Sequence, residues 1–278
     1  VGQEVNGAKR WINIAGLQFQ PSEVAKFAII VLLARLTQNF GEKTRFFRWG
    51  VLGFGGALLG ILVPLALEKH LSAIMLMGMV AVLMMYIAGT HPKWLLLGAL
   101  GAAAFLLVYT RMMGYAGDRV TAWLHPELDP GDTGYQILQS LYAIGSGGLF
   151  GLGYGKSRQK YLYLPFQYND YIFAVICEEL GLVGAMAIVA LFAVTILRGY
   201  WIALNARDRF STVLAAGLVT LIAVQTILNL CVVTNLLPST GIALPFFSYG
   251  GTALAVNLGE MGIVLNISRK RTIQEANT

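Results

Sequence analysis

The chain has little charge. Asp, Glu, Lys and Arg make up 12% of its 278 residues, whereas an ordinary soluble domain carries about 25%. Apolar residues reach 56%, and the mean hydropathy is +0.65. This composition excludes an ordinary soluble domain and predicts an all-α, polytopic bundle of membrane helices.

Reactive side chains are also few. The two cysteines, Cys177 and Cys231, fall in apolar runs, where we expect them to pack as small hydrophobes without a disulfide framework. The three histidines, His70, His91 and His125, show no metal-ligand spacing. Because the HExxH and GxSxG patterns are absent, zinc protease and serine hydrolase chemistry has no support.

What the chain does have is a series of apolar runs. Seven of them are long enough to cross a hydrocarbon core of about 30 Å. They cover roughly residues 21–39, 48–67, 71–89, 93–110, 170–197, 212–236 and 249–267. We treat residues 1–278 as one transmembrane domain, in which an N-terminal loop enters the first helix. The connection over 111–169 is a long loop, and the spacing around Ile137 and Leu141 predicts a short amphipathic helix on the membrane surface.

The positive charges predict the orientation. Alternate short loops carry Lys43, Arg45, Arg48, Lys93, Arg198, Arg207, Arg209, Arg269, Lys270 and Arg271. The opposite short loops carry only Lys69, and residues 237–248 carry no cation. By the positive-inside rule the first set and the C-terminus are cytoplasmic, and the N-terminal stretch and the 111–169 loop are outside. Basic residues confined to short loops between membrane spans predict no nucleic-acid partner.

Asp170 closes the long loop and opens an apolar helix. At that boundary a carboxylate can stay ionised and face a groove, whereas deeper in the bilayer it would cost about 2.5–3.5 kcal/mol. Position alone favours an N-terminal helix residue that complements the helix dipole. Glu178 and Glu179 follow, roughly 12–13 Å along a continuous helix. Neighbouring positions cannot share a helix face, so at least one of the two needs a buried partner or a proton.

Residues 145–157 are rich in glycine and end near Lys156. The nucleotide-binding phosphate loop needs Gly five places before its Gly-Lys pair, and Phe150 stands there. Two interpretations stay open. Backbone N–H groups with Lys156, Arg158 and Lys160 could hold a diphosphate, or the segment is a flexible surface loop with solvated cations.

Two further segments also allow two interpretations each. Glu23 and Lys26 lie three residues apart on one helix, where they could form a local ion pair or line a charged substrate groove. The connection over 238–252 contains two prolines, which exclude a simple continuous helix. It is either a re-entrant segment that lines the same outer groove or a stiff hairpin.

Four motifs in order cover nearly the whole chain. They are Gly7-Ala8-Lys9-Arg10-Trp11-Ile12 with Gln20-Pro21-Ser22-Glu23; Arg119-Val120-Thr121 to Trp123 with Gly134-Tyr135-Gln136 and Gln139-Ser140; Leu164-Pro165 with Asp170, Ile172-Phe173-Ala174 and Glu178-Glu179-Leu180-Gly181; and Pro238, Gly241, Leu244-Pro245 and Ser248-Tyr249-Gly250-Gly251. Together they resemble the SEDS family (shape, elongation, division and sporulation), which includes FtsW, RodA and SpoVE. The resemblance implies about ten membrane helices and therefore about three upstream of Val1. The ending Asn266-Ile267-Ser268-Arg269 is closer to the division and sporulation branch.

The resemblance implies a peptidoglycan glycosyltransferase that polymerises lipid II at the outer face of the bacterial cytoplasmic membrane. Asp170 takes the position of the family's essential aspartate, and a carboxylate there can act as general base on an acceptor hydroxyl. Cations would stabilise the diphosphate leaving group. The candidates are Arg119, Lys156, Arg158 and Lys160, with Mg²⁺ or Mn²⁺ as the metal.

The same resemblance implies further contacts and partners. Glu23, Lys26, Gln136 and Ser248 complete the expected substrate-binding set. Expected partners are lipid II, a class B penicillin-binding protein transpeptidase and membrane lipids. The chain departs from the family at Phe166 and Asn169, where Glu and Thr are common, and at His70-Leu71-Ser72, where many members are acidic. The alternatives are a lipid II translocator and a non-catalytic scaffold for a transpeptidase.

Overall fold

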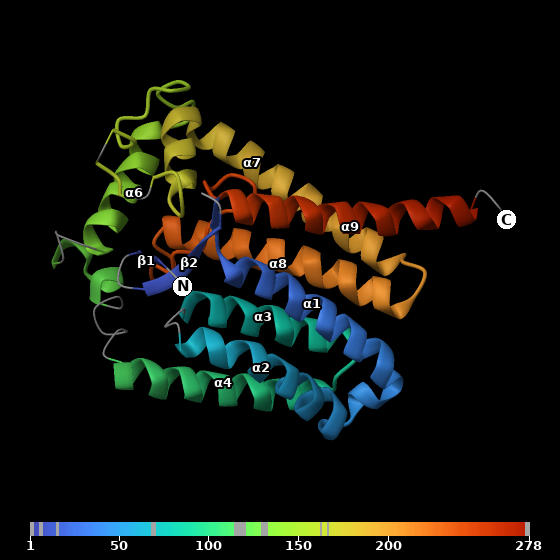
Figure 1. Ribbon diagram of the computed structural model, residues 1–278. Helices are drawn as coiled ribbons and strands as arrows, with labels where there is room; N and C mark the ends of the chain where they lie inside the picture. The colour runs from blue at the N-terminus through green and yellow to red at the C-terminus, as the bar shows by residue number, and fades with distance from the viewer. Residues whose placement is uncertain are drawn as a thin grey trace. The chain divides into compact units, whose positions relative to one another are not determined.

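A computed structural model shows the helices and strands of the chain (Figure 1). By its internal contacts the chain divides into two compact units. It describes residues 3–5, 8–14, 17–67, 71–113, 121–128, 133–161, 163–165 and 167–275. Unit 1 comprises residues 1–102, 195–224 and 250–278, and unit 2 comprises residues 103–194 and 225–249. We describe each unit by itself.

Unit 1 begins with a small antiparallel sheet, in the order β1-β2-β3. Its strands are β1 (Gln3–Val5), β2 (Ala8–Ile14) and β3 (Leu17–Phe19). In the second pairing Ile12 is opposite Phe19 and Ile14 is opposite Leu17. The expectation that this stretch is a loop is therefore wrong, although the all-α membrane bundle that follows is confirmed.

Every predicted apolar run forms a helix in the structure. The helices are α1 (Pro21–Phe40), the π-helical turn η2 (Arg48–Gly53) leading into α2 (Phe54–Leu67), α3 (Leu71–Ile87), α4 (Pro92–Met113), α7 (Ile172–Leu204), α8 (Arg209–Val233) and α9 (Gly251–Glu275). Pro21 stands at the first turn of α1, where its missing N–H costs nothing. Among the described residues, four stretches are long and apolar enough to cross a membrane: Pro21–Arg45, Arg48–Ala66, Ile172–Leu204 and Arg209–Val233. The helix α3 is a shorter apolar one.

The core of unit 1 lies where α1, α3 and the first part of α8 meet. Ile30 and Met84 are almost fully buried there. Gly217 of α8 fits against both, because a Cβ atom at this position would lie 2.7 Å from each of their side chains. This close approach of helices through a small residue is common in membrane bundles.

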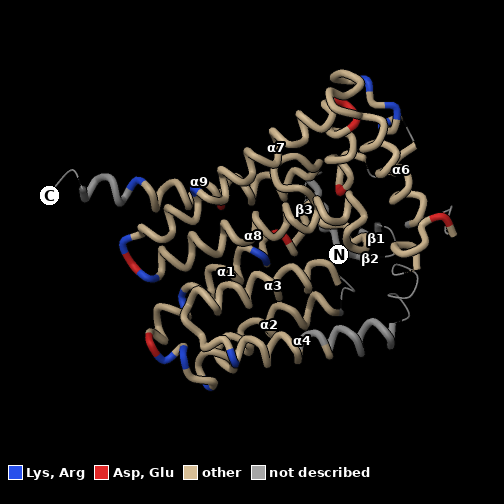
Figure 2. The backbone as a smooth tube through the Cα atoms, turned by 180° about the vertical axis from the view of Figure 1, so that it is seen from behind, with Lys and Arg blue, Asp and Glu red and all other residues tan. Residues whose placement is uncertain are grey.

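Three connections of unit 1 meet at one end of its helices. Arg209 Nη2, at the start of α8, donates to the carbonyl of Ala88, after α3, at 2.8 Å. Thr44 Oγ1, in the 3₁₀ turn η1 (Gly41–Arg45), donates to the same carbonyl at 2.9 Å. Lys43 and Arg45 of η1 and Arg207 before α8 lie in these connections, and Lys and Arg colour the turns at this end of the helices (Figure 2). The three connections therefore meet at the same end of the helices, and the side of the membrane that they face stays a prediction.

Unit 2 contains α6 (Thr133–Gly147), the 3₁₀ turn η3 (Pro126–Leu128), the first part of α7 and the last part of α8. The predicted short helix around Ile137 is confirmed as α6. Ser140 Oγ donates to the carbonyl of Val233 at 2.8 Å, and Trp123 Nε1 donates to the carbonyl of Asn235 at 3.0 Å. These bonds hold the end of α8 in place.

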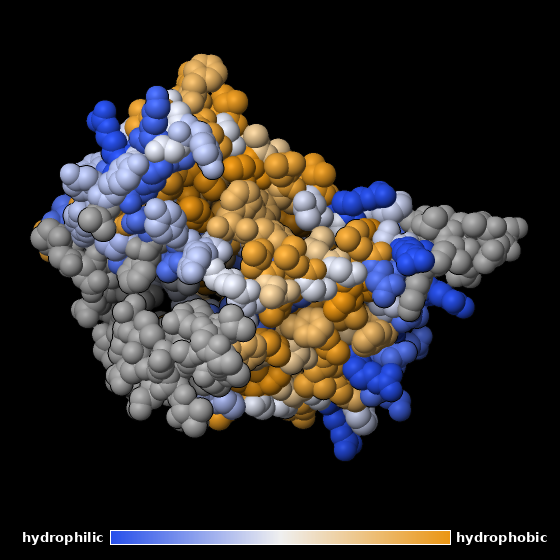
Figure 3. Space-filling model, turned by 45° about the horizontal axis from the view of Figure 1, so that its top comes forward, coloured by the Kyte–Doolittle hydropathy of each residue, from blue (hydrophilic) through white to orange (hydrophobic). Residues whose placement is uncertain are grey.

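Much of the surface of the helices is apolar (Figure 3). On α7 the exposed side chains include Leu182, Val183, Met186 and Leu191, each more than half exposed. A surface of this kind suits contact with lipid. The fold and its apolar surface are those of a membrane protein.

Candidate functional site

Asp170 lies in the turn that precedes α7, and its side chain is half-buried. The next residue, Tyr171, is fully buried and anchors the turn in unit 2. The Asp170 carboxylate lies beside the backbone of Gly241, because a Cβ atom there would be 3.7 Å from Oδ2. Gly241 has φ +66°, a conformation that glycine adopts without strain.

The connection after α8 packs against this turn. Ser248 Oγ donates to the carbonyl of Asn169 and accepts from the N–H of Leu244 at 2.8 Å. The N–H of Tyr249 donates to the carbonyl of Tyr168 at 2.7 Å. The connection is thus an irregular segment that forms one wall of the Asp170 site. The structure brings Ser248 and Asp170 together, and it uses the Ser248 hydroxyl to join the two segments.

An open hollow of ≈ 260 Å³ lies at the same place, lined by Gln167, Tyr168, Asn169 and Tyr249. Tyr168 is 55% exposed and Tyr249 is 83% exposed. Asn169, one of the departures from the family pattern, is therefore a lining residue. Phe166, the other departure near Asp170, lies outside the described residues.

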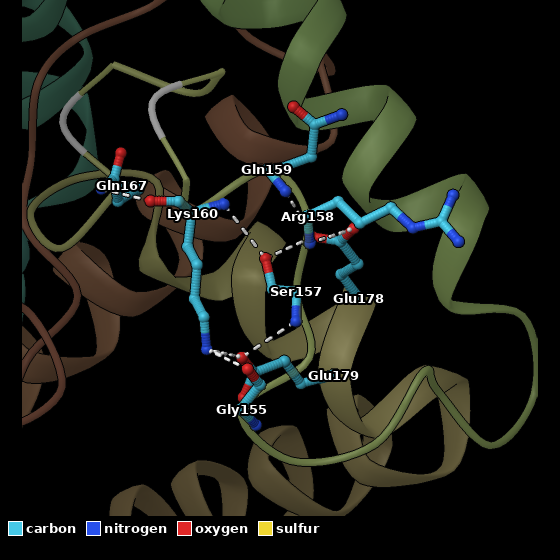
Figure 4. Close-up of polar contacts among 8 residues, drawn as sticks. All are labelled: Gly155, Ser157, Arg158, Gln159, Lys160, Gln167, Glu178 and Glu179. Atoms are coloured by element: carbon cyan, nitrogen blue, oxygen red, sulfur yellow. Dashed lines mark hydrogen bonds and ion pairs between the residues drawn. The ribbon is translucent and has the colours of Figure 1, made fainter.

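Glu178 is almost fully buried and holds the loop before the Asp170 turn (Figure 4). Its carboxylate accepts a hydrogen bond from Ser157 Oγ, one from the N–H of Arg158 at 3.0 Å and one from the N–H of Gln159 at 3.3 Å. The buried partner that the sequence required is therefore one hydroxyl and two backbone N–H groups.

Glu179 also binds this loop, through Gly155, Ser157 and Lys160. Its carboxylate accepts from the N–H groups of Gly155 at 2.9 Å and Ser157 at 3.3 Å, and pairs with Lys160 Nζ at 2.7 Å. This hydrogen bond raises the pKa of Lys160 above its ordinary value. The carbonyl of Lys160 in turn accepts from Gln167 Nε2 at 2.8 Å. We call residues 155–160 with Glu178 and Glu179 the carboxylate clasp, and Gln167 connects it to the hollow.

A break in α7 allows the loop to approach so closely. Gly181 has φ +68° and ψ −170°, so α7 consists of two helical parts, and the expectation of a continuous helix is wrong. The carbonyls of Glu178 and Glu179 accept from the N–H groups of Leu152 and Gly153 at 2.9 and 3.0 Å. Glycine is required opposite the break, because a Cβ atom at Gly151 would lie 2.1 Å from the carbonyl oxygen of Glu179.

The cations predicted to hold a diphosphate have different surroundings. Lys156 and Arg158 are exposed, and Arg158 points away from the two glutamates (Figure 4). Lys160 is engaged by Glu179 and by the carbonyl of Gly155 at 2.7 Å. Arg119 lies outside the described residues. Most of the N–H groups of residues 155–160 donate to Glu178 or Glu179, so within this segment the exposed side chains of Lys156 and Arg158 stay the candidates for a phosphate contact.

The other predicted residues lie elsewhere. Glu23 and Lys26 of unit 1 form an ion pair of 2.7 Å, with side chains 13% and 5% exposed. The local pair is thus confirmed, and its part in a groove stays a prediction. Glu260 on α9 is buried close to the charges of Glu23 and Lys26. Neither of its carboxylate oxygens has a hydrogen-bond partner among the described residues. Gln136 lies half-buried on α6.

Asn229 is the site residue that the sequence analysis missed. It is 1% exposed on α8, and its side-chain nitrogen donates to the carbonyls of Asp170 and Ile242 at 2.7 and 2.8 Å. The available signal was an amide side chain inside an apolar membrane run, which points to function by default.

Comparison with known proteins identifies the family. The family model that covers FtsW, RodA and SpoVE, described as cell cycle protein, matches residues 1–273. The chain belongs to this family. The resemblance drawn from the four motifs is confirmed, and with it the assignment of a SEDS membrane fold.

Relatives of the SEDS chain match along nearly its whole length. The probable peptidoglycan glycosyltransferase FtsW of Geobacter sulfurreducens is 43% identical over 273 residues, which are 97% of this chain and 72% of that protein. The stage V sporulation protein E of Bacillus subtilis is 40% identical over 271 residues, 97% of this chain and 74% of that protein. A solved chain from a peptidoglycan synthase complex, described as coordinating polymerization and crosslinking, shares 27% identity at a TM-score of 0.79, over 98% of this chain and 76% of that one.

Proposed function

We propose that this SEDS protein polymerises lipid II into glycan strands at the outer face of the bacterial cytoplasmic membrane, with Asp170 as the general base. Curated relatives are named peptidoglycan glycosyltransferases, and the chain is one as well. The observation that supports Asp170 is its setting. The half-buried carboxylate lies beside Gly241, in a turn held by Asn229, next to an open hollow.

The reaction assigns one clear task to that carboxylate. A sugar hydroxyl of the acceptor attacks the anomeric carbon of the donor, and the bond from that carbon to the diphosphate oxygen breaks. The hydroxyl proton passes to Asp170, and the polyprenyl diphosphate leaves with the bonding electron pair. A base must lie about 2.6–3.2 Å from the proton donor, so the proposal requires an acceptor hydroxyl bound beside Asp170.

Charge develops on the leaving diphosphate, and cations must offset it. Lys156 and Arg158 are the described candidates because their side chains are exposed. Lys160 supports them by holding the loop through Glu179. The remaining proposed substrate contacts rest only on the resemblance to the SEDS family. They are Glu23, Lys26, Arg119, Gln136 and Ser248.

A divalent cation, Mg²⁺ or Mn²⁺, is part of the proposal, and it would supply Lewis-acid stabilisation of the diphosphate. In the described part of the chain no three His, Cys, Asp or Glu side chains gather to hold it. These residues therefore do not form a metal site by themselves, and we route no step of the reaction through a metal.

The partner and the orientation are proposals of the same kind. A similar solved chain works in a peptidoglycan synthase complex, so we propose a class B penicillin-binding protein transpeptidase as partner. The three cation-bearing connections that meet at Ala88 would face the cytoplasm, as would the C-terminus.

Replacing the proposed base tests the function directly. In purified protein given lipid II, Asp170→Ala and Asp170→Asn should lower glycan-chain formation by roughly 10²- to 10⁴-fold, the usual share of a general base. The control is Glu127→Ala, which removes an exposed carboxylate of unit 2. Normal polymerisation by a folded Asp170→Ala would refute the assignment. If the wild type moves lipid II across the membrane in a way that depends on Glu23 and Lys26 and forms no polymer, a translocator is favoured. If the wild type shows neither activity, a scaffold is favoured.

A further inference from the structure

Asn229 occupies an unusual position in the apolar helix α8. Its side chain is 1% exposed and lies in the part of α8 that belongs to unit 2. Its amide nitrogen donates one hydrogen bond to the carbonyl of Asp170 at 2.7 Å and another to the carbonyl of Ile242 at 2.8 Å. One side chain therefore joins the turn that carries the carboxylate to the segment that faces it.

We propose that Asn229 is a positioning residue for Asp170, which fixes the turn against the Ile242 segment and so sets the place of the carboxylate. The proposal rests on the proposed role of Asp170 as general base. Asn229 itself is buried and does not touch the substrate.

The hydrogen bonds of the amide show which half of it the site uses. Both N–H groups of Nδ2 are engaged, whereas Oδ1 is buried and has no hydrogen-bond partner in the described structure. An unpaired buried oxygen is a cost to folding. An apolar side chain would avoid that cost but would leave the carbonyls of Asp170 and Ile242 without this donor, so the two donors are the reason for an amide here.

The second hydrogen bond acts on the carboxylate as well. Ile242 follows Gly241, and a Cβ atom on Gly241 would lie 3.7 Å from Asp170 Oδ2. Holding the carbonyl of Ile242 therefore also holds the backbone that contacts the carboxylate. Ser248 and Tyr249 secure the neighbouring carbonyls of Asn169 and Tyr168, whereas Asn229 reaches the backbone of Asp170 itself.

The expected effect follows from the geometry of proton transfer. A displacement of about 1 Å at a reacting group can cost about 100-fold in rate. Asn229→Leu keeps the side-chain volume and removes both donors. We expect kcat for lipid II polymerisation to fall roughly 10- to 100-fold, with KM changed by no more than about twofold. The acidic limb of the kcat–pH profile should shift, because the surroundings of the carboxylate change.

Leu228→Ala is the matched control, since Leu228 is the buried neighbour of Asn229 on α8. It should lower the thermal midpoint while kcat of the folded protein stays within about threefold of wild type. Asn229→Leu leaves the carbonyls of Asp170 and Ile242 without this donor, so it should lower the thermal midpoint as well, and kcat of the folded proteins separates the two variants. A folded Asn229→Leu protein with kcat within about threefold of wild type would overturn the positioning role.

The variants at Asp170 separate two kinds of failure. If Asp170→Ala still polymerises lipid II, the base assignment fails whatever Asn229 does. If Asp170→Ala is inactive and Asn229→Leu is active, only the positioning role fails. Because Asn229 acts through Asp170, the double variant should retain the same residual rate as Asp170→Ala alone. A further tenfold loss in the double variant would show an independent role and contradict the proposal.

Discussion

The carboxylate clasp gives the sharpest quantitative test of the structure. Glu178→Ala removes a buried acceptor of three hydrogen bonds, from Ser157 Oγ and from the N–H groups of Arg158 and Gln159. A hydrogen bond to a charged group contributes about 1.5–3 kcal/mol. Counting two strong bonds and one weaker bond, and allowing water to replace part of them, the loop should lose about 3–5 kcal/mol of local stability.

That loss changes how often the loop opens. At about 1.4 kcal/mol per factor of ten, the open population should rise roughly 100- to 4,000-fold. The loop carries Lys156, Arg158 and Lys160, so trypsin can report the opening. When opening and closing are fast, the cleavage rate follows the open population.

The assay is limited trypsinolysis of the protein in detergent, with cleavage after these three residues followed by mass spectrometry. Glu178→Gln keeps the shape and one acceptor oxygen, so it should be cleaved at an intermediate rate. Glu127→Ala, which removes an exposed carboxylate, should match the wild type. Equal cleavage of Glu178→Ala and wild type would refute the reasoning, because the loop would then be held by other contacts.

Two further predictions concern the same region. Gly181→Ala should lower the stability of the protein by about 2–4 kcal/mol, because φ there is +68° and the new Cβ would lie 2.3 Å from the N–H nitrogen of Gly151. Gly78→Ala, with no atom within 4 Å of its Cβ, should be neutral or stabilising in the same thermal-shift assay, and equal midpoints for the two variants would contradict the strained break. The raised pKa of Lys160 predicts a loop protected from hydrogen exchange while Lys160 is protonated, and less protected as pH rises past the ordinary lysine pKa of about 10.4 and then the raised one. Lys160→Met should lack this alkaline loss, and an unchanged pH profile in that variant would show that another group is responsible.

The membrane helices could be predicted because their signal is local. A long apolar run has few alternatives, and the turn chemistry at Pro21 marks the start of the first helix. The three-stranded sheet was missed because two of its strands have only three residues each and its pairing is set by tertiary context.

The clasp could not be predicted from residue types. Most donors to Glu178 and Glu179 are backbone N–H groups of residues about 20 positions earlier, and every residue but proline carries such a group. The glycines of the 145–157 segment suggested a cradle for an anion. In the structure Gly151 allows close contact with α7 instead. A glycine needed for close packing and a glycine that cradles an anion look the same in the sequence.

The break at Gly181 also bears on how the protein meets its membrane. As one continuous helix, the 33 residues of α7 would reach about 50 Å, well beyond a hydrocarbon core of about 30 Å. After the break, residues 182–204 alone reach about 34 Å, enough to cross the core. A change in bilayer thickness would therefore act on this second part by tilt or local thinning. The first part, with Glu178 and Glu179, is held by the loop hydrogen bonds instead. We expect the geometry around Asp170 to be insulated from hydrophobic mismatch, so that one site works unchanged in thin and thick membranes.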